Sequence, residues 1–479
     1  MHIVIAGNGI LAQAIAFELL QQPTLASRIT LVGKADRIGS ATLAAAAMLN
    51  SFAEVEKGSL ETPFDRYRFQ LSQQAARMWP DFARAILKAE DGGSFSAVGG
   101  EAIFDTGTVV VNNAAADDLD DENFDAILQA LKDYDEPYEL IEPGDIPNYQ
   151  PEQRYRALRA VHIEREGWMN PRQVVAALDR ALQRSSRVNM VDDAVVRLRH
   201  SNGRIGALEC ESGTFVEGDR FVLATGATVT EVLKASDLDL PIQRVFYGMG
   251  VSLEIRSEGH PHTKCVRTPN RGLACGIYTA PHSLDRATNS GNILIGATNL
   301  ISPTPLYAPR LANVESLLKA AIQQVNTNFY RAELVRTNVG WRPTSQDTQP
   351  LLGSTSVGNL MVASGTKRDG FHMAPLIAQK MVALMSGGTV ESEFAWFAPE
   401  RKPHRLLSRE AAVEKAVRHQ MSAAYQHGFT PPTSRMPDQI RNMLRDEIER
   451  LHDTVGAHDW GIPPEMLDMY RYGHAVAGV

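Results

Sequence analysis

Residues 2–20 of the chain read HIVIAGNGILAQAIAFELL, a pattern typical of a strand, a tight turn and a helix. The short apolar run Ile3–Ile5 is typical of a strand in a parallel sheet, which is buried on both faces. Gly7 and Gly9 end the run, and apolar residues then recur at helical spacing. A second apolar run, Ile29–Val32, follows at the distance expected for a strand–helix–strand unit. The stretch therefore predicts an α/β fold.

The turn itself reads GNGILA, a Gly-x-Gly-x-x-Ala pattern between a strand and a helix. Glycines in this place allow a tight turn and let backbone N–H groups approach a pyrophosphate, whose negative charge the helix N-terminus favours. We therefore expect a Rossmann-like, dinucleotide-binding domain in which the cofactor is contacted by Gly7, Gly9, Ile10 and Leu11. A purely structural glycine turn in another α/β protein is the alternative.

The second strand lacks the acidic residue that normally ends it. In Rossmann-type domains an Asp or Glu in this place binds the ribose hydroxyls, but here the strand ends in Gly33-Lys34. Either the ribose is held by backbone and by Lys34 or Arg37, or Asp36 substitutes for the missing carboxylate. This departure weakens an NAD-binding interpretation, and Gly33 and Lys34 are counted among the expected cofactor contacts.

The composition narrows the class of protein. The 479 residues include 48 Lys and Arg against 56 Asp and Glu, which gives a formal net charge of −8. With 44% hydrophobic and 22% charged residues, the chain is globular rather than disordered, collagen-like or a disulfide scaffold, and its negative charge makes it a poor nucleic-acid binder. The longest apolar-looking stretch, Ala41–Leu49, is far shorter than the roughly 20 residues of a membrane span. Three cysteines without a CxxC pair, and no visible signal peptide, predict a cytoplasmic protein.

The last part of the chain, residues 389–479, contains two amphipathic helical patterns separated by a linker rich in Pro, Thr and Ser. Such helices must bury their apolar stripes, so we expect them to dock on the body of the protein or on a second copy in a homo-oligomer. No metal-binding spacing is present. The histidines of this region are interpreted as surface residues: His404, His419, His427, His452, His458 and His474. Elsewhere, the acidic stretch Asp117–Glu122 is interpreted as a solvated loop.

Residues 39–54, GSATLAAAAMLNSFAE, combine small side chains with a Met-Leu pair. This segment resembles the flavin-contacting segment of the D-amino-acid oxidase superfamily, and glycine oxidase is the branch that it resembles most. A flavin ring that lies against a helix start requires small side chains, so that main-chain groups can reach it. The run is also compatible with a close helix-packing motif. The resemblance implies contacts to FAD from Ala41, Thr42, Ala46, Ala47 and Met48.

The resemblance extends over roughly residues 2–388. Residues 224–227, Ala-Thr-Gly-Ala, are similar to a strand end that closes over the cofactor, and GTKRDGFHMAP, residues 365–375, is similar to the family's last flavin loop. That loop enters a helix whose N-terminus would stabilise negative charge on the reduced ring. These segments, and a strand position that touches adenine, imply FAD contacts from Val195, Thr225, Gly226, Gly365, Thr366, Lys367, Arg368, Asp369, Gly370, Phe371 and His372. None of the cysteines fits the covalent attachment of sarcosine oxidases, so the FAD is expected to be non-covalent.

Three residues are expected at the substrate. Arg342, in a Gly-x-Arg-Pro motif, matches the residue that clamps the substrate carboxylate in the family, a role that suits a planar guanidinium. Tyr278 matches a tyrosine that assists the same carboxylate, and Arg368 matches a substrate-side or flavin-side arginine. A structural ion pair for Arg342 and an ordinary strand aromatic for Tyr278 are the alternatives. Thr366 and His282 depart from the glycine oxidase pattern, which makes glycine itself a doubtful substrate.

The resemblance implies a flavoprotein with two domains and a helical C-terminal extension. The expected division is a Rossmann-like FAD-binding domain from residues 1–90, 150–235 and 335–388, a mixed, mostly antiparallel substrate domain from 91–149 and 236–334, and the extension at 389–479. The implied reaction is oxidation of an amino acid or related carboxylate-bearing amine by hydride transfer to flavin N5, followed by hydrolysis of the imine. Oxygen is the expected acceptor, with Lys367 as a candidate oxygen-activating cation. The alternatives are a dehydrogenase of the same fold that reduces a quinone or a partner protein, and a flavin-holding, non-catalytic subunit of a complex.

Overall fold

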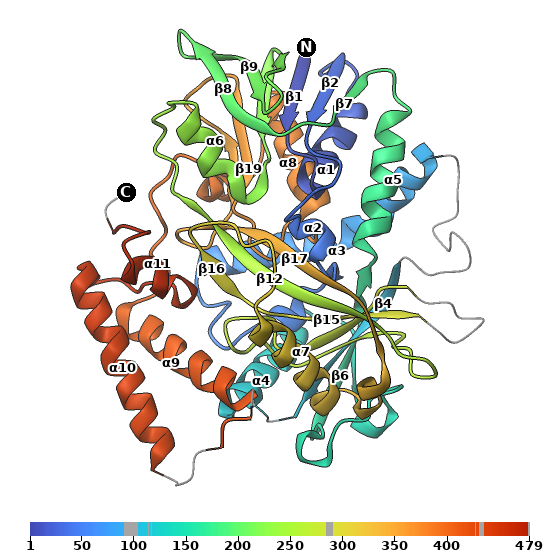
Figure 1. Cartoon of the computed structure of the whole chain (residues 1–479), viewed down its shortest axis with the longest axis vertical. Helices are drawn as coiled ribbons and strands as arrows, with labels where there is room; N and C mark the ends of the chain where they lie inside the picture. The colour runs from blue at the N-terminus through green and yellow to red at the C-terminus, as the bar shows by residue number, and fades with distance from the viewer. Residues whose placement is uncertain are drawn as a thin grey trace.

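The computed structural model describes residues 1–90, 104–113, 115, 117–283, 291–426, 428–430 and 435–477. Figure 1 shows a body built around β-sheets, with the helices of the C-terminal extension gathered at one side. The helices are α1 (Ile10–Leu20), α2 (Ala41–Ala44), α3 (Pro63–Glu90), α4 (Asp118–Asp133), α5 (Pro171–Gln183), α6 (Val229–Ala235), α7 (Leu311–Gln324), α8 (Ala374–Met385), α9 (Arg409–Gln426), α10 (Met436–Val455) and α11 (Leu467–Arg471). Within the described ranges, none of them is long and apolar enough to cross a membrane.

The first sheet has six strands and contains the strand that starts the chain. In spatial order they are β18 (Leu351–Ser354), β19 (Leu360–Ser364), β11 (Arg220–Leu223), β1 (His2–Ala6), β2 (Arg28–Val32) and β7 (Val188–Val191). Neighbouring strands are parallel except for the antiparallel edge pair β18–β19. All β1 residues after His2 are buried, as expected for a strand that is covered on both faces. The Rossmann-like prediction is confirmed.

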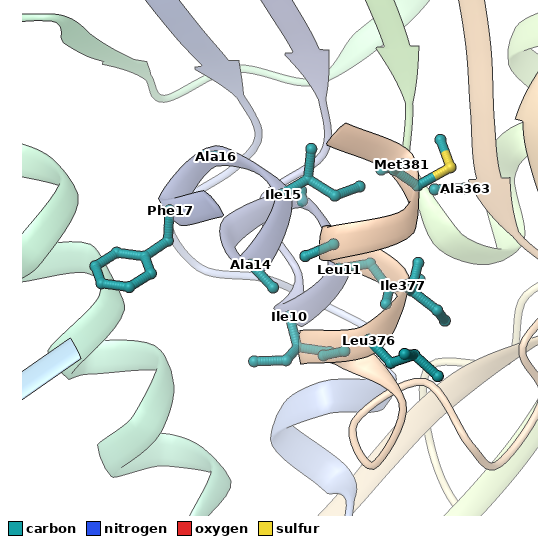
Figure 2. Packing of buried hydrophobic residues seen from close by; sticks show 14 of the residues in the cluster. Ile10, Leu11, Ala14, Ile15, Ala16, Phe17, Ala363, Leu376, Ile377 and Met381 are labelled. Atoms are coloured by element: carbon teal, nitrogen blue, oxygen red, sulfur yellow. The ribbon is translucent and has the colours of Figure 1, made fainter. Parts of the chain in front are cut away.

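Helix α1 is apolar on nearly every side because it lies between this sheet and other helices. In Figure 2, Leu11 of α1 lies beside Ile377 of α8, while Phe17 points away from α8. Phe17 meets Phe82 of α3 edge to face, with ring centroids 5.7 Å apart. This packing fixes the N-terminus of α1, and therefore the glycine turn before it, at the end of β1.

The second sheet is mixed and mostly antiparallel, which confirms the second part of the fold prediction. Its strands are β16 (Leu300–Ser302), β12 (Val245–Arg256), β15 (Asn292–Gly296), β14 (Tyr278–Pro281), β13 (Cys265–Arg267), β4 (Phe104–Asn112), β6 (Arg159–Met169) and β3 (Met48–Leu49), with β17 (Glu333–Ser345) paired to β12 and β5 (Tyr138–Ile141) to β6. Among the described residues of this sheet, β4 and β13 are the one parallel pair of strands. A small sheet contains β8 (Val195–Ser201), β9 (Arg204–Cys210) and β10 (Phe215–Glu217). The proposed division into domains stays a prediction.

The interpretation of Asp117–Glu122 as a solvated loop is wrong. The stretch leads into the first turn of α4, where the helix N-terminus favours acidic side chains. Asp120 is fully buried and pairs at 2.7 Å with Arg271, whose side chain is also fully buried. Phe124 and Leu131 on the same helix belong to a buried apolar cluster with residues of β4 and β6. The density of acidic residues alone favoured a loop, but the apolar residues that follow at helical spacing make the stretch the start of a helix.

The C-terminal extension docks on the body of the same chain. Val413 and Val417 of α9, together with Ile448 of α10, form an apolar cluster that includes Phe246 and Ile301 of the second sheet. Figure 1 shows α11, in dark red, beside β16, with α9 and α10 extending from it at the same side of the body. The docking surface buries the apolar stripes, so the extension needs no second copy to cover them, and the homo-oligomer stays a prediction.

Two histidines of the extension are buried, so their interpretation as surface residues is wrong. His419 and His452 are 2% and 0% exposed. In each, a ring nitrogen accepts a hydrogen bond from a backbone N–H: His419 Nδ1 from Leu273 at 3.0 Å and His452 Nε2 from Ile462 at 3.0 Å. A neutral imidazole supplies such an acceptor inside an apolar interface. His404 is half-buried and His458 and His474 are exposed, whereas His427 lies outside the described residues.

Acid is expected to loosen the contact between the extension and the body. Burial lowers the pKa of His419 from 6.5 to about 4, so this group stabilises the fold fully above pH 6.5 and loses that contribution as the pH falls toward 4. Between pH 7 and pH 5 the contribution should fall by about 2 kcal/mol. The measurement is the free energy of urea unfolding at both pH values, compared with His419→Asn, whose amide oxygen accepts without titrating. Equal pH dependence in the two proteins would contradict this role.

Candidate active site

A cavity of about 780 Å³ runs from the β1–α1 turn to the middle of the second sheet. Its volume is typical of small-molecule and cofactor sites. With the single exception of Gly365, every residue expected to contact the cofactor or the substrate lies in its wall. Segments that are far apart in the sequence therefore meet around one space, although this placement does not by itself test the role of any residue.

The β1–α1 turn approaches β11 so closely that only glycine fits at its first position. Gly7 has φ +117°, and a Cβ atom there would lie 2.3 Å from the Ala224 carbonyl oxygen. Gly9 precedes α1 and has no side chain that could cap the helix. The Ile10 N–H donates to Thr42 Oγ1 at 3.2 Å. The turn thus presents the positive end of α1 to the cavity, which is the arrangement that binds a pyrophosphate.

The end of β2 shows why an acidic residue is missing. A Cβ atom on Gly33 would lie 2.6 Å from Cγ of Asn8, whose amide donates to the Lys34 carbonyl oxygen at 2.7 Å. Asn8 therefore occupies the space of the usual side chain. Lys34 pairs at 3.0 Å with Glu211, which follows β9 and also lines the cavity. Glu211 is an acidic group near the expected ribose site that no local sequence signal indicated.

Arg37 does not point freely at the expected ribose site. Its guanidinium donates two hydrogen bonds to the Asp179 carboxylate of α5, at 2.7 and 2.9 Å, and its Nε donates to the Asn8 carbonyl oxygen. The side chain therefore fixes the glycine turn against α5. Asp36 also lies in the cavity wall.

The small-residue segment packs tightly against β17. A Cβ atom on Gly39 would lie 2.3 Å from the Trp341 ring, and the Trp341 N–H donates to the Gly39 carbonyl oxygen at 2.8 Å. On the other side of Arg342, the Pro343 carbonyl oxygen accepts from the Lys367 N–H at 2.8 Å. Strand β17 is thus fixed between the two segments expected to contact flavin, and it carries Arg342 between them.

The last loop, residues 365–373, is anchored to α3. The Asp369 carboxylate pairs with Arg68 at 2.6 Å, and the Phe371 ring stacks on Trp79 with centroids 5.0 Å apart. His372 contacts Ser72 through Nε2. Gly365 lies outside the cavity wall, and a Cβ atom there would lie 3.0 Å from the Leu351 N–H nitrogen. Its glycine is explained by close packing against β18 and a φ of +73°, rather than by contact with a cofactor.

Unpartnered polar atoms in the cavity wall fit a large polar ligand. In the described part of the chain, Thr225 Oγ1 and His372 Nδ1 are buried without a hydrogen-bond partner. Buried polar atoms in native proteins are normally hydrogen-bonded. Together with the glycine turn and the N-terminus of α1, which has no side-chain cap from Gly9, these atoms fit a dinucleotide that extends along the cavity. No group of three His, Cys, Asp or Glu among the described residues could hold a metal ion.

Arg342 and Tyr278 lie at the end of the cavity that the second sheet forms. Gly250 makes room for the guanidinium, since a Cβ atom there would lie 2.3 Å from Arg342 Nη2. Nη1 donates to the Thr298 carbonyl oxygen at 3.0 Å, and within the described residues no carboxylate lies at ion-pair distance. Burial raises the pKa of the Tyr278 hydroxyl, which therefore stays a neutral donor. A half-buried guanidinium without a carboxylate partner, in the same cavity wall as a hydroxyl donor, is suited to a carboxylate ligand.

Two groups beside Arg368 were missed by the sequence reasoning. Arg368 Nη1 lies 3.1 Å from Cys275 Sγ, and Nη2 lies 3.6 Å from the Glu54 carboxylate. Glu54 also forms an ion pair with the fully buried Arg267. Glu54 ends the small-residue segment, but Cys275 and Arg267 come from distant loops and strands, so no local pattern connects them.

The C-terminal extension reaches the last loop through Glu465. Its carboxylate oxygens lie 2.5 and 2.6 Å from Lys367 Nζ. Burial opposes ionisation of Glu465, but the Lys367 ammonium outweighs it and lowers the pKa of the carboxyl. The charge of Lys367 is therefore paired, which argues against its acting as an unpaired oxygen-activating cation.

The chain belongs to the FAD dependent oxidoreductase family, whose model matches residues 2–384. The cofactor of this family is FAD, and the residues described above fit it. Over 196 residues the chain is 26% identical to a D-amino acid dehydrogenase of Vibrio atlanticus, covering 41% of this chain and 43% of that protein. Over 283 residues it is 27% identical to the bifunctional protein ThiO/ThiG of Trichormus variabilis, covering 56% and 38%. The matched part thus spans less than half the length of these curated relatives.

Solved structures show the same fold. Glycine oxidase from Geobacillus kaustophilus superposes with a TM-score of 0.67 at 21% identity, covering 84% of this chain and 98% of that one. Iminodiacetate oxidase from Chelativorans sp. BNC1 superposes with a TM-score of 0.66 at 19% identity, covering 84% and 100%.

Proposed function

We propose that the chain is an FAD-dependent oxidase of an amino acid or a related carboxylate-bearing amine. The observation that carries this proposal is the half-buried Arg342 guanidinium, which has no carboxylate partner among the described residues and lines the same cavity as the segments expected to contact flavin. A substrate carboxylate is the ligand that satisfies both Arg342 and the Tyr278 hydroxyl.

The chain's own residues would orient the substrate rather than react with it. Arg342 and Tyr278 hold the carboxylate, and this fixes the α-carbon next to the small side chains Ala46 and Ala47. When bound, FAD supplies the two-electron acceptor that takes the C–H hydrogen as hydride. The N-terminus of α8 and the backbone of the last loop favour negative charge at this end of the cavity. The released imine is hydrolysed in water.

An amine dehydrogenase that passes electrons to a quinone or a partner protein is the second candidate. It is supported by the curated relatives named D-amino acid dehydrogenase, and by the pairing of Lys367 with Glu465. Peroxide formation under air, compared with the reduction of a redox dye, separates the two candidates. Near-stoichiometric peroxide supports the oxidase.

The proposed function predicts that an amine of the right class bleaches the flavin without oxygen. The measurement is loss of flavin absorbance in the anaerobic holoenzyme after addition of each member of a panel of amino acids and secondary amines. The panel includes both enantiomers because the geometry does not select one. If no amine bleaches the flavin, a flavin-holding subunit without catalysis is the better explanation. Acid precipitation of the holoenzyme should release the FAD, since the attachment is proposed to be non-covalent.

A further inference from the structure

At the substrate end of the cavity, most charged side chains among the described residues form ion pairs, and the cationic side chains outnumber the carboxylates by two. Lys367 pairs with Glu465, and Lys415 of α9 pairs with Glu56 at 2.6 Å. Two more pairs lie in or behind the cavity wall, between Arg68 and Asp369 and between Arg267 and Glu54. The guanidinium groups that remain are Arg342 and Arg368.

Other titratable groups nearby make their closest contacts with groups other than these two guanidinium groups. Burial raises the pKa of Glu166 to about 7, and its carboxyl oxygens accept hydrogen bonds from the backbone N–H groups of Ser51, Phe52 and Ala53. Burial lowers the pKa of His419 to about 4, so this ring is neutral near pH 7. Glu54 is shared between Arg267, which it contacts directly, and Arg368 at 3.6 Å. Burial opposes the charge of Arg368, but Glu54, Glu465 and Glu56 help to raise the pKa of its guanidinium, which therefore stays charged and available to an anionic ligand.

Arg342 and Arg368 lie near the same point of the cavity. Arg368 Nη1 is 3.1 Å from Cys275 Sγ. Burial raises the pKa of the Cys275 thiol, and the charges of Arg368 and Arg342 both act on it in the opposite direction. Cys275, Tyr278 and both arginines line the one cavity. The thiol therefore contacts Arg368, and Arg342 lines the same cavity.

We propose that the substrate carries two acidic groups, one bound by Arg342 and Tyr278 and the other by Arg368. This inference rests on the proposed function and names the substrate class: an amino-dicarboxylic acid, or a secondary amine with two carboxylates. The described residues at this end of the cavity carry two more cationic side chains than carboxylates, and a dianionic ligand balances that excess charge. A substrate with one carboxylate would leave Arg368 without its ligand.

The test compares pairs of amines that differ in one charge. Aspartate is compared with asparagine and glutamate with glutamine, in both enantiomers, and iminodiacetate with sarcosine, by the rate of anaerobic flavin reduction at varied concentration. The dicarboxylate should be preferred at least about tenfold in kcat/KM, as expected for a charge-assisted hydrogen bond in a buried site. Succinate should likewise perturb the visible spectrum of the bound flavin at a concentration at least about tenfold lower than butyrate does.

Arg368→Gln should reduce these preferences to less than about threefold, whereas Arg256→Gln, which removes an exposed guanidinium on β12, should leave them unchanged. If Arg368→Gln weakens monocarboxylates and dicarboxylates equally, Arg368 acts on the flavin and the inference is overturned. Amines that reduce the flavin without preference for the dicarboxylate overturn the substrate class alone. If no amine reduces the flavin, the proposed function fails and the substrate class with it.

Discussion

Replacing Arg342 with alanine is expected to raise the KM for the amine substrate by roughly 30- to 1000-fold, equivalent to about 2–4 kcal/mol, while FAD stays bound. The guanidinium is half-buried in the cavity wall, donates to the Thr298 carbonyl oxygen, and has no carboxylate partner in the described part of the chain. Its interaction with a substrate carboxylate is made in the ground state and in the transition state alike, so the loss falls mainly on KM. Steady-state kinetics and the flavin content of the purified variant provide the measurement.

Arg336→Ala is the matched control for this experiment. Arg336 lies on the same strand, β17, but its side chain is 52% exposed. Its Nε lies 3.9 Å from the Glu254 carboxylate, a long distance for an ion pair. Glu254 itself is buried, but it also accepts a hydrogen bond from Asn292, so it is not left without a partner. Because Arg336 is absent from the cavity wall, the KM of the control should change less than about twofold. An unchanged KM in Arg342→Ala would overturn the carboxylate-binding role, and loss of FAD would show that the arginine is structural.

Local sequence was sufficient to predict the parts of the molecule that a single turn or segment determines. The β1–α1 turn needs glycine because its backbone lies against Ala224, and this requirement is visible in a few consecutive residues. The small side chains of 39–48 are required by a similarly close approach to β17. Such positions leave a pattern in the sequence because the backbone itself approaches another group.

Contacts between distant segments could not be predicted in this way. The pairing of Lys367 with Glu465 joins residues nearly a hundred positions apart, and neither residue lies in a pattern that requires the other. The same holds for the buried pair of Asp120 and Arg271, since a carboxylate in an acidic stretch is normally solvated. The burial of His419 could not be predicted for the same reason, because its acceptor role depends on the Leu273 N–H, which is 146 positions away in the sequence.

The second large effect is expected on FAD binding, at the β1–α1 turn that forms the other end of the cavity. Gly7→Ala should raise the dissociation constant of FAD by at least roughly 100-fold, because the turn cannot keep its shape. Gly7 has φ +117°, which L side chains rarely adopt, and the new methyl group would lie 2.3 Å from the Ala224 carbonyl oxygen. Both the turn and the end of β11 are backbone, so neither can rotate away. The FAD content after purification and fluorescence titration of the apoprotein measure the effect.

Gly203→Ala separates the strained φ from the collision with backbone. Gly203 lies in the β8–β9 turn with φ +73°, and a Cβ atom there would have nothing within 4 Å. This variant should lose about 1 kcal/mol of stability and keep its FAD. If Gly7→Ala bound FAD as tightly as the wild-type chain, the N-terminal turn would not be the pyrophosphate site. Close packing of β1 on β11 would then be the sole reason for glycine at this position. Loss of FAD from the Gly7 variant alone, with the fold retained by circular dichroism, would place the pyrophosphate at this turn.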